Sequence, residues 1–187
     1  MSLKKYWNVL RHNPAAGLWG FFHRLRRMLP VDYYWGDFSF FPDFITLLIT
    51  KRCNFKCPRC ASKSPELGDT FEELTTQELK NFIDSVARIK PFIYFSGGEP
   101  LLRPDIFEVI HTIKSKKMLV GMVSNGSFLD EAHVRCLIEA RVDFFSVSLD
   151  GPASYHDSVR GVPGAFEQAV RGLRLLIQER KKKKVSY

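Results

Sequence analysis

Between residues 44 and 180, short apolar runs rich in β-branched and aromatic residues alternate with segments of helical periodicity. Each run has the length of one strand, and each segment between runs is long enough for one helix. This alternation predicts a parallel α/β sheet, because parallel strands need a crossover connection that is usually helical. We expect strands at 44–50, 92–95, 119–123 and 144–149, and helices beginning at a capping box of Thr75 and Glu78, at 105–116, at 130–140 and around 166–177.

The fourth expected strand carries different side chains on its two faces. Phe145, Val147 and Leu149 share one face, whereas Ser146, Ser148 and Asp150 share the other. Helices that cover one side of a sheet need the apolar face, so the polar face is left to line a cavity. The pattern therefore favours a barrel or curved half-barrel with a functional lumen over a flat sheet buried on both sides.

A distinctive motif follows every expected strand at its C-terminal end. In parallel α/β folds these ends meet at one edge, where ligands bind. We therefore expect the motifs to form one site, to which an arginine in the last loop can add a partner for a carboxylate. The motifs are Cys53 to Cys60, Gly97 to Pro100, Ser124 to Gly126 and Ser148 to Gly151, and the arginine is Arg160; His156 and Asp157 are interpreted as polar groups of a turn.

Three of the four cysteines, Cys53, Cys57 and Cys60, lie at C-x3-C-x2-C spacing. Clustered thiols are typical of a metal site in a reducing compartment, whereas a disulfide framework spreads its partners along the chain. Structural zinc sites and ordinary iron–sulfur clusters take four protein ligands, so three cysteines indicate a centre with one position open for chemistry. The alternative is a zinc site completed by His111, His133 or a water.

The net charge of +8 is concentrated at the two ends of the chain. Residues 1–30 hold six Lys or Arg and no acid, and residues 180–184 are five consecutive bases, so the remainder is mildly acidic. This distribution disfavours a nucleic-acid binder. We assign residues 1–43 to a basic, aromatic extension; packing on the domain and peripheral contact of residues 1–41 with an anionic membrane both stay open. Neither a signal peptide nor a membrane-spanning run is indicated, so a cytoplasmic protein is expected.

Taken together, the cysteine motif, the Gly97–Pro100 motif, the Ser124–Gly126 motif and the Ser148–Gly151 motif resemble those of the radical S-adenosylmethionine (radical SAM) superfamily. The resemblance covers about residues 44–180. The segments around Asp150 and Arg160 look most like the branch with C-terminal auxiliary-cluster (SPASM-like) domains, which includes peptide-modifying maturases.

The resemblance implies a partial (β/α)6 barrel with a 4Fe-4S cluster on Cys53, Cys57 and Cys60. S-adenosylmethionine would chelate the fourth iron, and its reductive cleavage would give a 5′-deoxyadenosyl radical that takes hydrogen from an unidentified peptide or small-molecule substrate. An electron donor such as flavodoxin or ferredoxin is implied as a partner. In the implied cofactor site, the methionine ammonium is held by Gly97, Gly98 and Glu99. The ribose or the carboxylate lies near Ser124 and Asn125, and the ribose lies near Ser148 and Asp150. A carboxylate is met by Arg160, and the cofactor lies against Phe55 and Arg59.

The sequence departs from the family pattern in two respects. Arg59 stands before the third cysteine, where the family usually has an aromatic or large apolar residue, so weaker packing on adenine is expected. About four of the six strand–helix units are present, with residues 185–187 as the beginning of a fifth strand, so residues 44–187 are expected to be a C-terminally incomplete core domain. A catalytically inactive, truncated iron–sulfur or metal-binding protein is therefore the alternative function.

Overall fold

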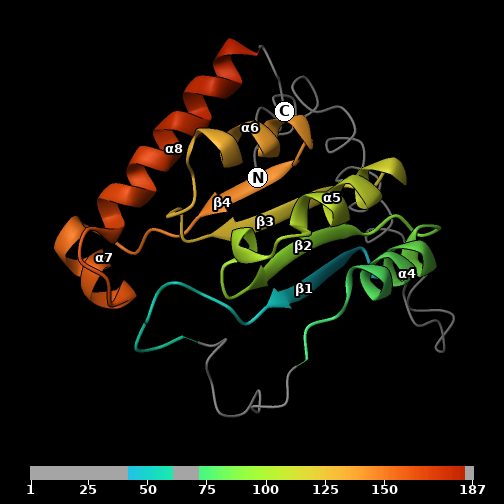
Figure 1. The fold of residues 1–187 in the computed structure, drawn as a ribbon, viewed down its shortest axis with the longest axis horizontal. Helices are drawn as coiled ribbons and strands as arrows, with labels where there is room; N and C mark the ends of the chain where they lie inside the picture. The colour runs from blue at the N-terminus through green and yellow to red at the C-terminus, as the bar shows by residue number, and fades with distance from the viewer. Residues whose placement is uncertain (1–41, 61–71, 184–187) are drawn as a thin grey trace, which may run out of the picture.

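The computed structural model describes residues 42–60 and 72–183, and four strands in these residues form one parallel sheet in the order β1-β2-β3-β4 (Figure 1). The strands are β1 (Phe44–Thr50), β2 (Phe92–Gly97), β3 (Val120–Ser124) and β4 (Phe144–Val147). Phe44 lies opposite Phe92, Ile93 opposite Val120 and Gly121 opposite Phe144. The parallel α/β fold that the sequence predicts is confirmed.

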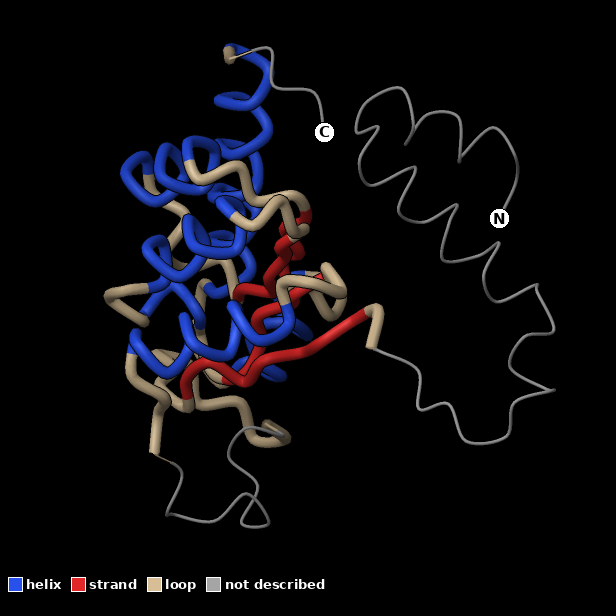
Figure 2. Tube along the Cα trace, turned by 90° about the vertical axis from the view of Figure 1, so that its right-hand side faces the viewer, coloured by secondary structure: helices blue, strands red, loops and turns tan. Residues whose placement is uncertain are grey.

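Helices follow each strand and gather on one side of the sheet (Figure 2). They are α4 (Thr76–Val86), α5 (Ile106–Ser115), α6 (Glu131–Glu139), α7 (Ala153–Arg160) and α8 (Ala165–Lys182), with a short 3-10 turn, η3 (Pro100–Leu102), after β2. The predicted capping box at the start of α4 is present, since Thr75 accepts from the backbone of Glu78 and Glu78 accepts from the backbone of Thr75. These caps satisfy backbone donors that the first helical turn leaves unpaired.

The hydrophobic core lies between the sheet and this helical layer. Its strand side chains include Ile93, Phe95, Val120 and Met122, all fully buried. The opposite face of the sheet is more exposed to solvent than the core face, as shown by Phe44 and Phe144, which keep 47% and 42% of their surface exposed. A sheet covered on one side agrees with the curved half-barrel that the fourth strand predicts.

The structure corrects three sequence predictions around the last strand. β4 ends at Val147, so Leu149 leaves the expected apolar face and is 43% exposed. The segment that contains His156 and Asp157 is the helix α7 and no turn. The last predicted helix exists as α8, and of the apolar face that its pattern predicts only Ile177 is exposed; the predicted face consists of Phe166, Ala169, Val170, Leu173 and Ile177, and the buried residues are Ala165, Ala169, Gly172 and Leu176.

Small residues make up most of the buried face of α8. A Cβ atom on Gly172 would lie 2.4 Å from the Cβ atom of Leu129, so the helix packs where it has no side chain. Apolar periodicity is blind to such contacts, because glycine and alanine add little to a hydrophobic pattern. The predicted extension at residues 1–43 lies almost wholly outside the described residues, as do residues 185–187. Among the described helices, none has the length and apolarity needed to cross a membrane.

Candidate cofactor site

A pocket of about 370 Å³ lies at the C-terminal edge of the sheet. In Figure 1 all four arrowheads point to the side where the loop after β1 and helix α7 lie. The pocket brings together every predicted site residue except Glu99. Its lining consists of Cys53, Phe55, Cys57, Arg59, Cys60, Ser96, Gly97, Gly98, Val123, Ser124, Asn125, Ser148, Asp150, Val159 and Arg160.

The cysteine loop leaves β1 directly and presents three half-buried cysteine side chains, none in a disulfide among the described residues, to the pocket. The sulfur of Cys53 accepts from the backbone N–H of Phe55 at 3.4 Å and from the side-chain amide of Asn125 at 3.9 Å. Donors aimed at a sulfur favour its thiolate form, which is the form that ligates metal. In the described part of the chain, no three His, Cys, Asp or Glu side chains converge closely enough to hold a metal ion.

The two glycines after β2 are required by a close approach to the cysteine loop. Gly97 has φ +115°, and a Cβ atom on it would lie 2.4 Å from the carbonyl oxygen of Thr50. A Cβ atom on Gly98 would lie 2.2 Å from the carbonyl oxygen of Arg52. The backbone N–H groups of Gly98 and Glu99 donate to these carbonyls at 2.7 and 2.8 Å. The glycines therefore lock β2 against the backbone that leads into Cys53.

Glu99 lies behind the pocket wall and is fully buried. Its carboxylate accepts from the backbone N–H of Asn125 at 2.7 Å, from the hydroxyl of Ser124 at 3.0 Å and from the backbone N–H of Leu101 at 3.1 Å. Burial raises the pKa of Glu99, and these three donors oppose the rise. The carboxylate thereby ties the end of β2 to the end of β3.

Helix α7 brings Arg160 back to the edge of the sheet. The guanidinium donates to both carboxylate oxygens of Asp150, at 2.7 Å from Nε and 3.0 Å from Nη2. The next residue, Gly161, has φ +66°, and a Cβ atom on it would lie 2.7 Å from the carbonyl oxygen of Lys56. The C-terminus of α7 thus rests on the cysteine loop.

Sequence reasoning missed three pocket residues, Ser96, Val123 and Val159, together with the helix that supplies the last. A signal for α7 exists, because Pro152 precedes it and Gly161 ends it in the left-handed conformation. For Ser96 and Val123 the signal is their position at the C-terminal ends of β2 and β3, beside the motifs already selected.

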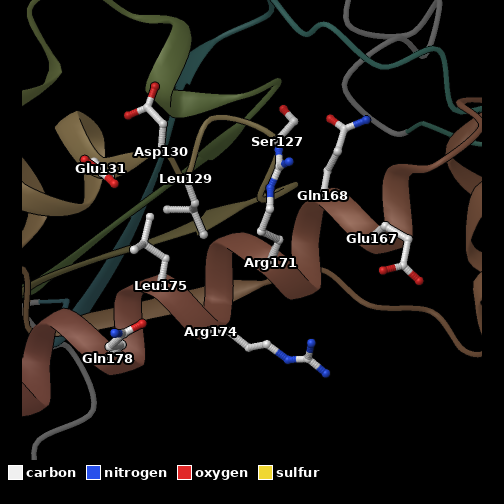
Figure 3. A pocket seen from close by; sticks show the side chains of 10 residues that line it. All are labelled: Ser127, Leu129, Asp130, Glu131, Glu167, Gln168, Arg171, Arg174, Leu175 and Gln178. Atoms are coloured by element: carbon white, nitrogen blue, oxygen red, sulfur yellow. The ribbon is translucent and has the colours of Figure 1, made fainter.

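A second pocket, of about 500 Å³, lies between α8 and the start of α6 and contains none of the predicted site residues. In Figure 3, Arg171 extends from α8 toward Ser127, whereas Arg174 points away from it. Acids and arginines are mixed in its wall, with Asp130, Glu131 and Glu167 among the former. No cluster of thiols or strand-end motifs lines it, so the first pocket is the candidate site.

The fold and the first pocket define a parallel α/β protein with a cysteine-lined ligand site at the C-terminal edge of its sheet. Comparison with known proteins gives the family, because residues 47–187 match the radical SAM superfamily. The chain belongs to this superfamily, which confirms the resemblance seen in the sequence. The family is one of enzymes whose cofactors are a 4Fe-4S cluster and S-adenosylmethionine.

Three relatives show how far the similarity extends. An AdoMet-dependent heme synthase of Methanosarcina barkeri (strain Fusaro / DSM 804) is 42% identical over 137 residues, which are 72% of this chain and 39% of that protein. A PqqA peptide cyclase of Granulibacter bethesdensis (strain ATCC BAA-1260 / CGDNIH1) is 32% identical over 130 residues, 68% of this chain and 34% of that protein. The solved structure of native anSMEcpe with bound AdoMet is 25% identical with a TM-score of 0.60, covering 75% of this chain and 41% of that chain.

The chain therefore spans about a third to two fifths of the length of these relatives. The chemistry of the pocket's side chains fits the family's cluster, since three thiols line the pocket and hydrogen-bond donors reach Cys53. The residues opposite them offer hydroxyl, amide, carboxylate and guanidinium groups, which suit a ligand with hydroxyls, an ammonium and a carboxylate.

Proposed function

We propose that this chain is the core of a radical SAM enzyme that binds a 4Fe-4S cluster through Cys53, Cys57 and Cys60. The observation that carries the proposal is that the three thiols share one pocket with motifs from the ends of all four strands. A zinc site completed by His111 or His133 is disfavoured, because neither histidine lines this pocket. Each thiolate of a 4Fe-4S cluster binds a different iron, so the three thiols do not have to converge on a single metal position.

The opposite wall of the pocket is proposed to hold S-adenosylmethionine. Ser148 and Asp150 provide acceptors for the ribose hydroxyls, and Ser124 and Asn125 lie where the ribose or the carboxylate is bound. Arg160, whose guanidinium is paired with Asp150 in this structure, is proposed to supply the partner for the carboxylate. Phe55, which is buried, and Arg59, which is exposed, are proposed to pack on the adenine.

The methionine ammonium is proposed to lie at the end of β2, beside Gly97 and Gly98. Glu99 was expected to meet it directly, but its two oxygens already accept three hydrogen bonds in the protein interior. We therefore assign Glu99 the task of holding the Gly97–Gly98 segment and the Ser124–Asn125 segment at a fixed separation. Its charge still favours an ammonium at this edge of the pocket.

Held by Cys53, Cys57 and Cys60, a reduced cluster would supply the one-electron chemistry by which S-adenosylmethionine is cleaved to methionine and a 5′-deoxyadenosyl radical, the species that would take a hydrogen atom from the substrate. The side chains of this chain orient the cofactor and exclude water, since Phe55 and Val123 close part of the pocket with apolar surface. We propose a peptide or small molecule as the substrate and a flavodoxin or ferredoxin as the electron donor, in the cytoplasm. Residues 44–187 would form the core, and residues 1–43 a separate extension that either packs on it or contacts a membrane surface.

The proposal is tested on protein reconstituted with iron and sulfide without oxygen. We expect four irons per chain, a loss of the cluster's visible absorption in Cys57→Ala, and no loss in Cys136→Ala, which changes the cysteine outside the pocket. Dithionite and S-adenosylmethionine should then yield 5′-deoxyadenosine. A cluster that gives no 5′-deoxyadenosine would favour the alternative, an inactive iron–sulfur protein, and an unchanged cluster in Cys57→Ala would contradict the ligand assignment.

A further inference from the structure

His156 is a fully buried histidine, and the polar contacts of its ring in the described residues are all with Asp150. Its Nδ1 lies 3.1 Å from the Oδ2 atom of Asp150 and accepts from the backbone N–H of Asp150 at 3.3 Å. Its Nε2 is also buried and has no hydrogen-bond partner within the part of the chain that the structure describes. The ring packs edge-on against Phe166, with 5.9 Å between centroids.

This arrangement is unfavourable for folding, so stability alone does not explain a histidine at position 156. A neutral imidazole carries one proton, so Nδ1 cannot both donate to the Asp150 carboxylate and accept from the Asp150 backbone. Whichever tautomer is present, the polar atom Nε2 is buried without a partner, which destabilises the fold relative to an apolar side chain of similar size. A leucine here would remove that cost, so the chain retains an imidazole for what Nδ1 does at Asp150.

Asp150 is the link between this buried ring and the pocket. It lines the pocket together with Arg160, to which it is bound through both carboxylate oxygens, whereas His156 does not line the pocket. When the guanidinium of Arg160 turns to a ligand's carboxylate, Asp150 gives up part of this pairing. The single hydrogen bond that Nδ1 makes to Asp150, either to its carboxylate or from its backbone N–H, then remains to hold Asp150 in place.

We propose that His156 is a positioning residue for S-adenosylmethionine binding. It acts by orienting Asp150 and, through Asp150, Arg160. This inference rests on the proposed function, because it assumes that the pocket takes S-adenosylmethionine. It adds a residue outside the pocket to the set that determines the cofactor's affinity.

The chain supplies a matched control in a second Asp–His pair. His133 contacts Asp130 through Nδ1 at 2.9 Å, much as His156 contacts Asp150, but neither residue of that pair lines the cysteine pocket. His133→Leu therefore removes an Asp–His contact at a pair that is more exposed and lies outside the pocket lining. His156→Asn is the conservative variant, because its side-chain amide reaches the place of Nδ1, whereas His156→Leu fills the space without a polar atom.

The experiment measures the dissociation constant for S-adenosylmethionine and the thermal midpoint on anaerobically reconstituted protein. We expect His156→Leu to weaken binding about tenfold, the size of one hydrogen bond to a charged group, while its thermal midpoint holds or rises. His156→Asn should bind nearly as the unsubstituted protein, and His133→Leu should bind unchanged. Equal affinity of His156→Leu and the unsubstituted protein would overturn the inference. The inference would also be overturned if His156→Leu lowered the thermal midpoint and His156→Asn did not restore the affinity, because this result is expected of a histidine with a purely structural role.

A ligand-free measurement separates this inference from the proposed function. If the unsubstituted protein binds no S-adenosylmethionine, the proposed function fails, and nitrogen chemical shifts of the His156 ring still report its contact with Asp150. Asp150→Asn should change the tautomer balance of His156 and leave that of His133 as it was. Unchanged shifts at His156 would show that its ring does not hold Asp150, and the inference would be wrong on that ground alone.

Discussion

The carboxylate of Glu99 accepts the backbone N–H of Asn125 at 2.7 Å, and this bond joins the loop after β2 to the loop after β3. Both loops contribute to the pocket, with Gly97 and Gly98 on one side of the bond and Ser124 and Asn125 on the other. Two loops that are joined by a buried carboxylate with three donors are held more rigidly than loops without such a link. Breaking any of the three bonds would leave a polar group unpaired in the interior. The separation of the two loops is thereby set before a ligand enters.

Glu99→Gln is expected to destabilise the protein by about 1–3 kcal/mol, the cost of leaving a buried donor unsatisfied. Glutamine has the shape of glutamate, but its NH2 group would face one of the donors that the carboxylate now accepts, such as the Asn125 N–H. Chemical denaturation measures the loss. Glu108→Gln, on an exposed side chain of α5 that pairs with Lys80, serves as the control and should change stability little. Equal stability of the Glu99 variant and the parent would contradict the bracing role.

Much of this site was predictable from the sequence, for a reason that lies in the topology. Four strand–helix units predict parallel strands, and parallel strands bring their C-terminal ends to one edge. Motifs as far apart in sequence as Cys53 and Arg160 could therefore be assigned to one pocket without any contact being known. The grouping of these motifs at one edge of the sheet required nothing more than the order of the elements.

The contacts behind the pocket wall were not predictable in the same way. A glutamate beside two glycines suggests an exposed side chain, and only the neighbouring strand β3 provides the donors that bury Glu99. The role of His156 depends on α7, which folds the ring back onto Asp150 across six residues of sequence. The pattern was interpreted as a turn at His156 and Asp157, whereas the helix α7 directs His156 inward and lets Asp157 accept from the backbone at the start of α8.

Gly161→Ala is expected to weaken cluster binding, whereas Gly164→Ala is not. Both glycines have positive φ, +66° and +76°, so alanine costs each backbone about 1–2 kcal/mol of conformational strain. Only at Gly161 would the new Cβ atom also press on the cysteine loop, 2.7 Å from the Lys56 carbonyl oxygen; at Gly164 no atom of the described residues lies within 4 Å of it. Iron content after reconstitution, at matched thermal stability, distinguishes them. Equal iron contents would show that the α7 contact does not shape the loop.

Arg59→Phe is expected to tighten S-adenosylmethionine binding by about threefold to tenfold, since aromatic pairs contribute about 0.5–1.5 kcal/mol beyond the area that they bury. Arg59 is exposed and lines the pocket beside Cys60, where it is proposed to pack on adenine. The control is Lys56→Phe, in the same loop and equally exposed, but outside the pocket lining. Calorimetric titration of the reconstituted proteins gives both affinities. A weaker affinity in Arg59→Phe would instead indicate that the guanidinium itself binds the cofactor.

Asp157 links the site helix α7 to α8 and gives the protein a pH-dependent element. Its carboxylate accepts from the backbone N–H of Phe166 at 2.9 Å and from that of Gly164 at 2.6 Å. These bonds to the charged form, that from Phe166 first, hold the pKa of Asp157 below its ordinary value of 3.8. A carboxyl whose pKa is lower in the folded than in the unfolded state contributes stability above the unfolded value. That contribution is lost as the pH falls through the folded value.

Asp157→Asn is therefore expected to lower the thermal midpoint at neutral pH, and the gap to the parent should close as the pH falls below 3.8. The direction follows from linkage, since the parent loses its advantage only when Asp157 takes up a proton in the folded state. Thermal melts over a pH series measure the gap. Asp84→Asn is the control, because Asp84 forms an exposed pair with Lys116 whose removal should cost little at any pH. A gap for Asp157→Asn that persists unchanged at low pH would show that the charged carboxylate is not what stabilises the junction of α7 and α8.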